Sequence, residues 1–336
     1  MAGCDFANAR LGARRAWLLG ARGLRELVAR PDLPTRLEFL RKAGYAEGVP
    51  PAATPGDLLA SVEAALWEMP RRDALRALRD IEGARPRLLL RAFLLFQDAA
   101  TLKALFRGLA RSEPAERLLS LVEPSPGFPK PTLRALAARP GPASAAAMLE
   151  RQGSPFAGAA VEAVPGLGRT GGALRLESAI DREAFVLALA AARGGGEDAR
   201  VLRRVLAVRA DLVNARTLLC LGGAGAPAEF FVPGGTRLGA ARLASLARLP
   251  PGALRESLSE WVGPAAALAS PFRADELLAR VLGRVARAEA RCRPLSLAVA
   301  LSFLLDRQAE VRRIRLVLRG AEFGLAADEL LDLLET

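Results

Sequence analysis

The segment AVRADLVNARTL, residues 207–218, has counterparts in LLFQDAATLKAL, residues 94–105, and DRQAEVRRIRLV, residues 306–317. Each has an acidic residue at its fifth position and an apolar or small residue four places later. A basic residue follows five places after the acid, and an aliphatic residue seven places after it. The three acids are separated by 113 and 99 residues. This recurrence predicts a triplicated helical unit of about a hundred residues.

A second set of acids keeps the same register, because each precedes one of the first acids by 34 or 35 residues on an earlier amphipathic segment. The two sets of acids and the basic residues five places after the later set define the charged positions of the repeat. These positions are Glu63, Asp98, Lys103, Glu177, Asp211, Arg216, Glu276, Glu310 and Arg315.

The acids at 98, 211 and 310 are expected to be partly buried, because the residues four and seven places later on the same helical face are apolar or small. A buried carboxylate needs a cationic or hydrogen-bonding partner to offset its lost hydration. Arg91 and Arg204 lie seven residues before the first two acids, on the same side of the predicted helix. We favour the structural interpretation, in which the acids hold helices together, over a proton-handling or catalytic role.

The sequence predicts an all-α protein. Ala, Leu and Arg, which are good helix formers, dominate it, and strand patterns are nearly absent. The best strand candidate is the short Ala-rich segment 159–164. Segments with a period near 3.6 residues cover 7–29, 35–44, 56–68, 85–111, 174–193, 197–221, 237–249, 273–291 and 295–319.

The composition indicates a globular chain and excludes several kinds of active site. The 336 residues are 51% hydrophobic and 25% charged, with a net charge of +12 that arises from arginine, since only three of the 48 basic residues are lysines. There is no histidine, which removes histidine bases, Ser-His-Asp triads and most zinc and haem sites. We expect no catalytic, cofactor-binding or metal-binding residues.

Features outside the repeat suggest a soluble protein of a reducing compartment. Cys4, Cys220 and Cys292 are far apart and form no CxxC pair. The N-terminal segment does not have the pattern of a signal peptide. The longest apolar run, residues 295–305, is too short to cross a bilayer, which needs about 18 apolar residues. We therefore expect an intracellular bacterial protein that is not inserted in a membrane.

Two motifs point to other functions. The segment GLGRTG, residues 166–171, has the GxGxxG spacing of dinucleotide sites, but Pro165 precedes it and no strand–helix–strand series follows. We interpret it as a flexible loop before a helix, and no GxxxxGK[ST] loop is present. Arg312, Arg315 and Arg319 form a basic stripe that could contact a partner, and a second basic cluster comprises Arg71, Arg72, Arg76 and Arg79. Solvated faces, acidic loops of a partner, anionic lipid and nucleic acid all remain open as explanations.

The order of several short motifs resembles one family over essentially the whole chain. The motifs include Asp211, Asn214, Arg216 and Leu219 after a helix with Leu176, Glu177, Asp181 and Phe185, and an opening Asn8-Ala9-Arg10-Leu11. Phe230 with Pro233-Gly234-Gly235, Pro294-Leu295-Ser296, and Glu310 with Arg313-Ile314-Arg315 and Gly320 complete the set. Together they resemble the C subunit of the archaeal and bacterial V/A-type ATPases (ATP synthases), the counterpart of the d subunit of eukaryotic V-ATPases. Thr101 and Arg313 stand where that family usually has Asn, and Phe6 and Phe185 where Tyr is common.

The resemblance implies a funnel of three similar helical subdomains about a pseudo-threefold axis, which we place at residues 1–126, 127–230 and 231–336. It implies a non-catalytic central-stalk subunit that lies on the cytoplasmic face of the membrane and is peripheral to it. Its expected partners are the central shaft subunits and the membrane rotor ring, and its expected role is to couple them during proton or sodium transport. It implies no nucleotide, nucleic acid, cofactor or metal. The alternatives are a helical-repeat scaffold for an acidic partner or nucleic acid, and an enzyme that uses carboxylates and arginines without histidine.

Overall fold

A computed structural model describes residues 3–45, 54–222 and 227–335, and these residues form helices and no strand. The predicted all-α class is therefore confirmed. The six long helices are α4 (Pro55–Asp80), α5 (Ala84–Ala110), α10 (Gly172–Ala191), α11 (Glu197–Leu221), α15 (Pro271–Cys292) and α16 (Ala298–Glu322). The shorter helices are α1 (Asp5–Arg15), α2 (Gly20–Val28), α3 (Leu33–Lys42), α6 (Ala115–Leu121), α7 (Lys130–Ala137), α8 (Pro142–Arg151), α9 (Ala157–Ala163), α12 (Ala240–Leu246), α13 (Pro251–Ser259), α14 (Ala265–Leu268) and α17 (Ala327–Glu335). Two short 3-10 turns, η1 (Val164–Gly166) and η2 (Ala228–Phe230), complete the set.

The predicted helices 85–111, 174–193 and 197–221 agree closely with α5, α10 and α11. Other boundaries differ. The range 7–29 is two helices separated by residues 16–19, and the range 56–68 continues through Pro70 to Asp80. The segment 159–164, the best candidate for a strand, lies in α9 and at the start of η1, in keeping with the all-α prediction.

Most of the short helices lie outside the predicted segments, and several of them begin at prolines, which usually interrupt a helix. Pro142 and Pro251 are the first residues of α8 and α13, and Pro131 lies in the first turn of α7. At that position the missing proline N–H has no helical partner to lose, and the fixed φ suits the helix. These prolines therefore mark the beginnings of helices rather than the ends of preceding ones.

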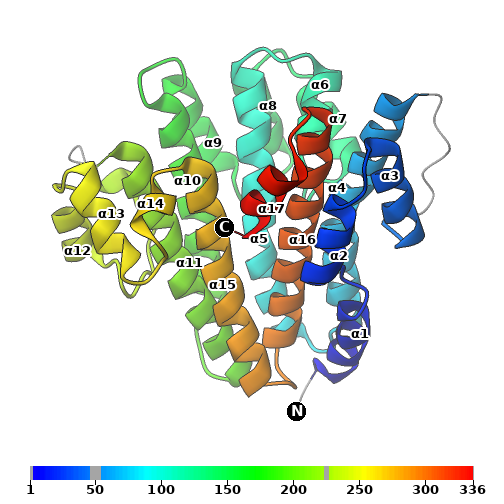
Figure 1. The fold of residues 1–336 in the computed structure, drawn as a ribbon. Coiled ribbons are helices and arrows are strands. Elements are labelled where there is room, and N and C mark those ends of the chain that lie inside the picture. Colours follow the sequence, from blue (N-terminus) through cyan, green and yellow to red (C-terminus); the bar gives the residue numbers. More distant parts are fainter. Residues whose placement is uncertain (1–2, 46–53, 223–226, 336) are drawn as a thin grey trace.

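The long helices form the interior and run side by side, and the short helices lie around them (Figure 1). The larger core is formed by all or part of α1 and α4–α16, and Phe93, Phe185 and Phe303 are among its largest buried side chains. A smaller second core joins α2, α3 and the first half of α4 to the second half of α16 and to α17. The two ends of the sequence are thus packed together.

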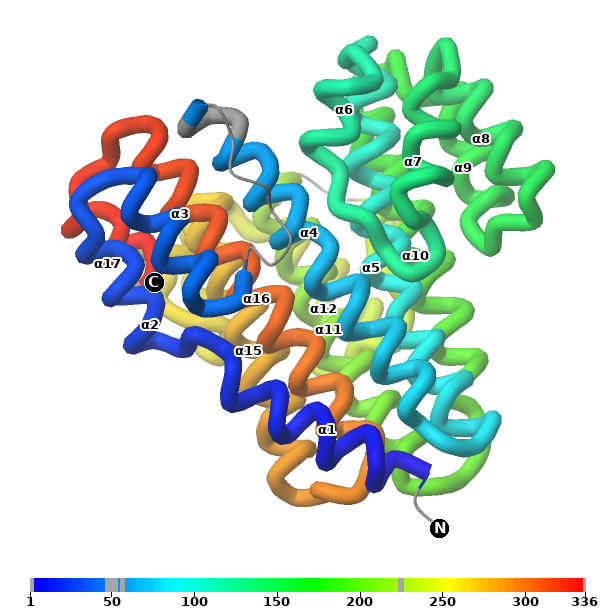
Figure 2. The backbone as a smooth tube through the Cα atoms, turned by 90° about the vertical axis from the view of Figure 1, so that its right-hand side faces the viewer, coloured from blue at the N-terminus to red at the C-terminus, as the bar shows by residue number. Residues whose placement is uncertain are grey.

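The long helices pack in an order that closes on itself. Along the chain the long helices form three consecutive pairs, α4/α5, α10/α11 and α15/α16. The second helix of each pair packs on the first helix of another pair: α5 on α10, α11 on α15, and α16 on α4. The last of these contacts brings the C-terminal pair back to the N-terminal pair, and Figure 2 shows α16 lying beside α4. A closed cycle of three equivalent contacts is what a pseudo-threefold arrangement requires. The axis itself, the funnel shape and the three subdomain boundaries remain predictions.

Candidate functional site: acid anchors and helix seams

The acid Asp98 of α5 anchors the loop that precedes α7. Its buried side chain accepts a hydrogen bond from the Gly127 N–H at 2.8 Å. A Cβ on Gly127 would lie 2.6 Å from Asp98 Oδ2, so only glycine lets the loop come this close. Three residues along the helix, the Thr101 hydroxyl donates to the Glu123 carbonyl at 2.7 Å. Burial raises the pKa of Asp98, and its polar contacts with Ser125 and Gly127 lower it.

Asp211 of α11 makes the corresponding anchor for the loop that precedes α12. Its side chain is 1% exposed and accepts backbone hydrogen bonds from Thr236, Arg237 and Leu238 at 3.2, 2.9 and 2.8 Å. Gly235 lies so close that a Cβ there would be 2.4 Å from Asp211 Oδ1. Asn214, three residues after the acid, exchanges two hydrogen bonds with the backbone of Val232 at 3.0 and 2.8 Å. This anchor therefore shares three features with that of Asp98: the acid, a polar residue three places later and a glycine in the loop.

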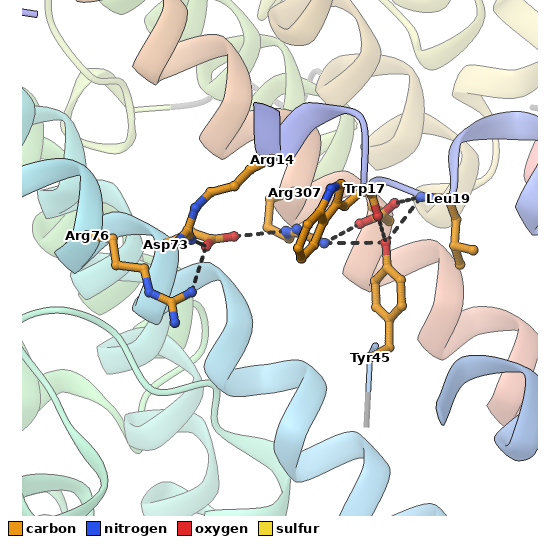
Figure 3. A network of polar contacts seen from close by, with 8 residues as sticks. Arg14, Trp17, Leu19, Tyr45, Asp73, Arg76 and Arg307 are labelled. Carbon is orange, nitrogen blue, oxygen red and sulfur yellow. Dashed lines mark hydrogen bonds and ion pairs between the residues drawn. The ribbon is translucent and has the colours of Figure 1, made fainter. Parts of the chain in front are cut away.

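The third acid, Glu310 of α16, makes its anchor with the other end of the chain. It accepts the N–H of Leu19, the residue before α2, at 2.6 Å. The Arg307 guanidinium donates to the same carboxylate at 2.6 Å, and Tyr45 also interacts with it (Figure 3). Burial raises the pKa of Glu310, and Arg307 lowers it. Each of the three acids therefore fixes the segment just before a short helix, and the third joins residues 291 positions apart.

The sequence predicts a cationic or a hydrogen-bonding partner for each acid. Asp98 and Asp211 have hydrogen-bonding partners, chiefly backbone N–H groups. Arg204, the arginine suggested beside Asp211, instead pairs with Glu289 at 2.9 Å. The acid–loop contacts were missed because they join segments that no helical periodicity relates. The available signal was Gly127 and Gly235, which follow their acids by 29 and 24 residues.

The three contacts between helix pairs, α5/α10, α11/α15 and α16/α4, are called seams below. The basic residues five places after the acids form ion pairs across them. Lys103 pairs with Asp181 at 2.7 Å between α5 and α10, and Arg216 with Asp275 at 2.9 Å between α11 and α15. In the third seam, between α16 and α4, Arg315 lies 3.4 Å from the buried carboxylate of Glu63. Arg319 also pairs with Glu63, and Arg107 pairs with Glu177 at 2.9 Å. Glu276 departs from this scheme, because its partner is Arg312 at 3.6 Å within the α15/α16 pair.

The predicted basic stripe is largely ion-paired. Arg312 pairs with Glu276, Arg315 with Glu63, and Arg319 with both Glu63 and Glu322. The Arg315 guanidinium also lies 3.6 Å from the centre of the Trp67 ring, a cation–π contact. The three arginines line a shallow cavity of about 270 Å³. Whether they contact a partner stays a prediction, and a partner would meet guanidinium groups that already hold carboxylates.

Glu123 lies near Arg312 and Arg315 of α16, and the pKa of its carboxyl group is strongly raised. Burial raises its pKa from 4.5 to about 7, although Arg312 and Arg315 oppose the shift. Because the folded protein favours the neutral form, it binds more protons than the unfolded chain between pH 4.5 and 7. The contribution of Glu123 to stability is therefore fully present below pH 4.5 and is lost as the pH rises through about 7.

We expect Glu123→Gln to remove this pH dependence. The variant should be more stable than the wild type at pH 8 by on the order of 1–3 kcal/mol, and the advantage should vanish near pH 4. Urea unfolding of both proteins across this pH range measures the difference. Glu116→Gln, at an exposed site on α6, is the matched control and should show no such trend. An equal difference between wild type and Glu123→Gln at all pH values would contradict the assignment.

The remaining sequence motifs have structural positions. The GLGRTG segment begins at the last residue of η1 and leads into α10, so it follows a helix and a 3-10 turn rather than a strand. Across residues 3–45, 54–222 and 227–335, no cluster of three or more Cys, Asp or Glu side chains has the geometry to hold a metal ion. The same part of the chain contains no helix that is both long and apolar enough to span a bilayer.

The fold and the site define an all-helical protein in which three long helix pairs pack in a closed cycle, joined by acid anchors and ion-paired seams. The chain belongs to the ATP synthase (C/AC39) subunit family, whose profile matches residues 7–333. It is 33% identical over 339 aligned positions to the C subunit of the V-type ATP synthase of Thermus thermophilus, covering 96% of this chain and 95% of that protein. The same-named protein of Deinococcus radiodurans is 28% identical over 97% of this chain and 89% of its own length. The C subunit of the A-type ATP synthase of Haloferax volcanii is 34% identical over 46% of this chain and 47% of its own length.

Proposed function

We propose that this chain is the non-catalytic central-stalk subunit that joins the rotating shaft of a V/A-type ATP synthase to its membrane rotor ring. In this role it lies on the cytoplasmic face of the membrane and is peripheral to it. It grips the tip of the shaft on one side, rests on the ring on the other, and turns with both while protons or sodium ions cross the membrane. Membership of the C/AC39 family supports the assembly, and the architecture supports the coupling role.

The observation that carries the proposal is the closed cycle of helix contacts, α5 on α10, α11 on α15 and α16 on α4. A coupling piece must pass torque from one face to the other without internal slip. In an open array of repeats, the terminal helices would be free to move relative to each other. Here every seam has neighbours on both sides and is bridged by an ion pair, those of Lys103, Arg216 and Arg315. A load on any one pair is therefore shared by the other two.

The charge of the chain supports association with acidic or anionic surfaces. The net charge of +12 gives a long-range attraction toward acidic loops or a negatively charged membrane face. Contact of this kind weakens with salt, because mobile ions screen exposed charges over about 10 Å at 0.1 M. We expect the purified protein to bind the shaft and the ring separately, and its affinity for the ring to fall as salt is raised.

The decisive experiment removes this protein from the assembled complex. Hydrolysis of ATP by the soluble part should survive, whereas ATP-driven ion pumping should be lost, and so should the sensitivity of hydrolysis to inhibitors that act on the ring. Adding back the wild-type chain should restore both. The Arg22→Gln chain should restore them equally well, because the side chain of Arg22 is 93% exposed and pairs with its helix neighbour Glu26. Full pumping without the protein would rule the coupling role out.

A further inference from the structure

A cavity of about 430 Å³ lies where α1 crosses α4 and α16, close to the Glu310 anchor. Among the described residues that line it, five are arginines and one is acidic. We call it the arginine pocket; its arginines are Arg10, Arg14, Arg72, Arg76 and Arg307, and its acid is Asp73. Segments far apart in the sequence build it, so it exists only in the folded chain.

Among the described residues, the five arginines of the pocket outnumber the carboxylates that pair with them, which are those of Asp73, Asp80 and Glu310. Arg14, Arg307 and Arg76 all converge on Asp73, with nitrogen–oxygen distances of 2.8, 3.0 and 3.6 Å. Figure 3 shows Asp73 between Arg76 and Arg307. Asp73 is buried, as is Arg307, whose side chain is only 7% exposed. One carboxylate has two oxygens, so three guanidinium groups cannot all be satisfied by it in the forked, two-bond geometry that arginine favours.

The other two arginines add to the surplus. Arg10 reaches Asp80 at 3.3 Å and shares that carboxylate with Arg79. For Arg72 no ion pair is present within the described residues, although its side chain lines the cavity. Positive groups gathered around so few carboxylates repel one another, most strongly where water is excluded. An additional anion in the cavity would offset this repulsion.

The cavity also has an apolar wall beside its cationic one. Trp17, at its edge, is 76% exposed, and Met69 and Tyr45 complete that side. The Tyr45 hydroxyl donates to the Trp17 carbonyl at 3.2 Å, which fixes the tryptophan backbone at the edge. Guanidinium groups match the oxygens of a phosphate, and an aromatic edge suits the organic group attached to it.

We propose that the arginine pocket binds a phosphate-bearing anion, with the phosphate among Arg14, Arg72, Arg76 and Arg307 and its organic substituent against Trp17. The inference does not depend on the proposed coupling role, since it rests on the lining of this cavity alone. The phosphate can come from a soluble organic phosphate or from the headgroup of an anionic phospholipid. The two sources differ in whether the group is free or fixed in a bilayer, so the experiment contains one arm for each.

In the first arm, the full chain is titrated with inorganic phosphate and with pyrophosphate at constant ionic strength, followed by calorimetry and by the fluorescence of Trp17. The expected result is saturable binding with a change in tryptophan emission that Trp17→Phe removes. In the second arm, the chain is mixed with phosphatidylcholine vesicles that contain or lack phosphatidic acid, and co-sedimentation is measured. Binding in the first arm only assigns a soluble phosphate, and binding in the second assigns a lipid headgroup.

The variant that tests the pocket is Arg72→Gln with Arg76→Gln. Arg72 holds no described carboxylate and Arg76 is half-exposed, so their removal leaves no buried charge unpaired. Binding should weaken at least about tenfold in the responding arm. The control is Arg22→Gln with Arg117→Gln, which removes the same charge from two exposed arginines that pair with Glu26 and Glu113, each four residues away. No binding by the wild type in either arm, or equal weakening in the two double variants, would overturn the proposal.

Discussion

Replacing Asp211 by alanine is expected to lower the free energy of unfolding by about 3–5 kcal/mol. The carboxylate accepts the N–H groups of Thr236, Arg237 and Leu238, and the alanine variant leaves these donors without their acceptor, the first two partly buried and that of Leu238 buried. The loop before α12 would also lose the group that fixes it to α11. Urea or guanidinium unfolding of the purified chain measures the change. The stability of Asp211→Asn should lie between those of the wild type and Asp211→Ala, because an amide oxygen still accepts hydrogen bonds but carries no charge.

The matched control is Asp275→Ala, which removes an acid that lies in the α11/α15 seam rather than in a loop anchor. Asp275 pairs with Arg216, and both side chains are about half-exposed. An ion pair in that setting contributes about 0–1 kcal/mol, because water solvates both groups when the pair is broken. Equal losses in the two alanine variants would show that the Asp211 anchor has no special weight in the fold.

Replacing Arg307 by glutamine is expected to cost a similar amount, about 3–5 kcal/mol, for a different reason. Arg307 donates to Asp73 at 3.0 Å and to Glu310 at 2.6 Å, and all three side chains are buried. Without the guanidinium, the buried Glu310 loses its ion pair, and Asp73 is left with Arg14 and with the more distant Arg76. The unfolding free energy at neutral pH reports the loss, which should shrink as the pH is lowered and the carboxyl group of Glu310, whose pKa is raised by burial, takes up a proton.

Arg22→Gln again supplies the control, with an expected change of less than about 1 kcal/mol because its pair with Glu26 is exposed to water. A loss in Arg307→Gln that is equally small, or that does not change with pH, would mean that the network around Arg307 is already solvated. The substitution leaves the seams of Lys103 and Arg216 untouched. A large effect would therefore concern the closure between the two ends of the chain.

The sequence predicted the helical class, the extent of α10 and α11, and the family. These features depend on local periodicity and on residue spacing along one helix, which a sequence displays directly. It also gave a physical reason for the acids at 98, 211 and 310 to need partners. It could not name those partners, because Gly127 and Thr236 lie in loops whose approach to the helix depends on the packing of several elements.

The charged seams show the same limit. Lys103, Arg216 and Arg315 share a register that the repeat reveals, yet the acids that they meet do not. The positions equivalent to Glu63 in the other two repeats are 177 and 276. Asp181 lies four positions after the first of these, and Asp275 one position before the second. An ion pair between helices tolerates a shift of a few ångströms through the length of its side chains. The basic half of each seam was therefore readable from spacing, and the acidic half was not.

The contact between Leu19 and Glu310 has a consequence for how the chain is made. These residues are 291 positions apart, and Asn8 likewise donates to the carbonyl of Ser296, 288 positions away. At a synthesis rate of about 5–20 residues per second, α1 leaves the ribosome roughly 15–60 s before α16 does. During that interval the face of α1 that carries Ala7 and Leu11 has no completed surface to cover it. The nascent chain therefore has to keep its first helix from aggregating until its last long helix is translated, and a message truncated before α16 yields a product that stays open.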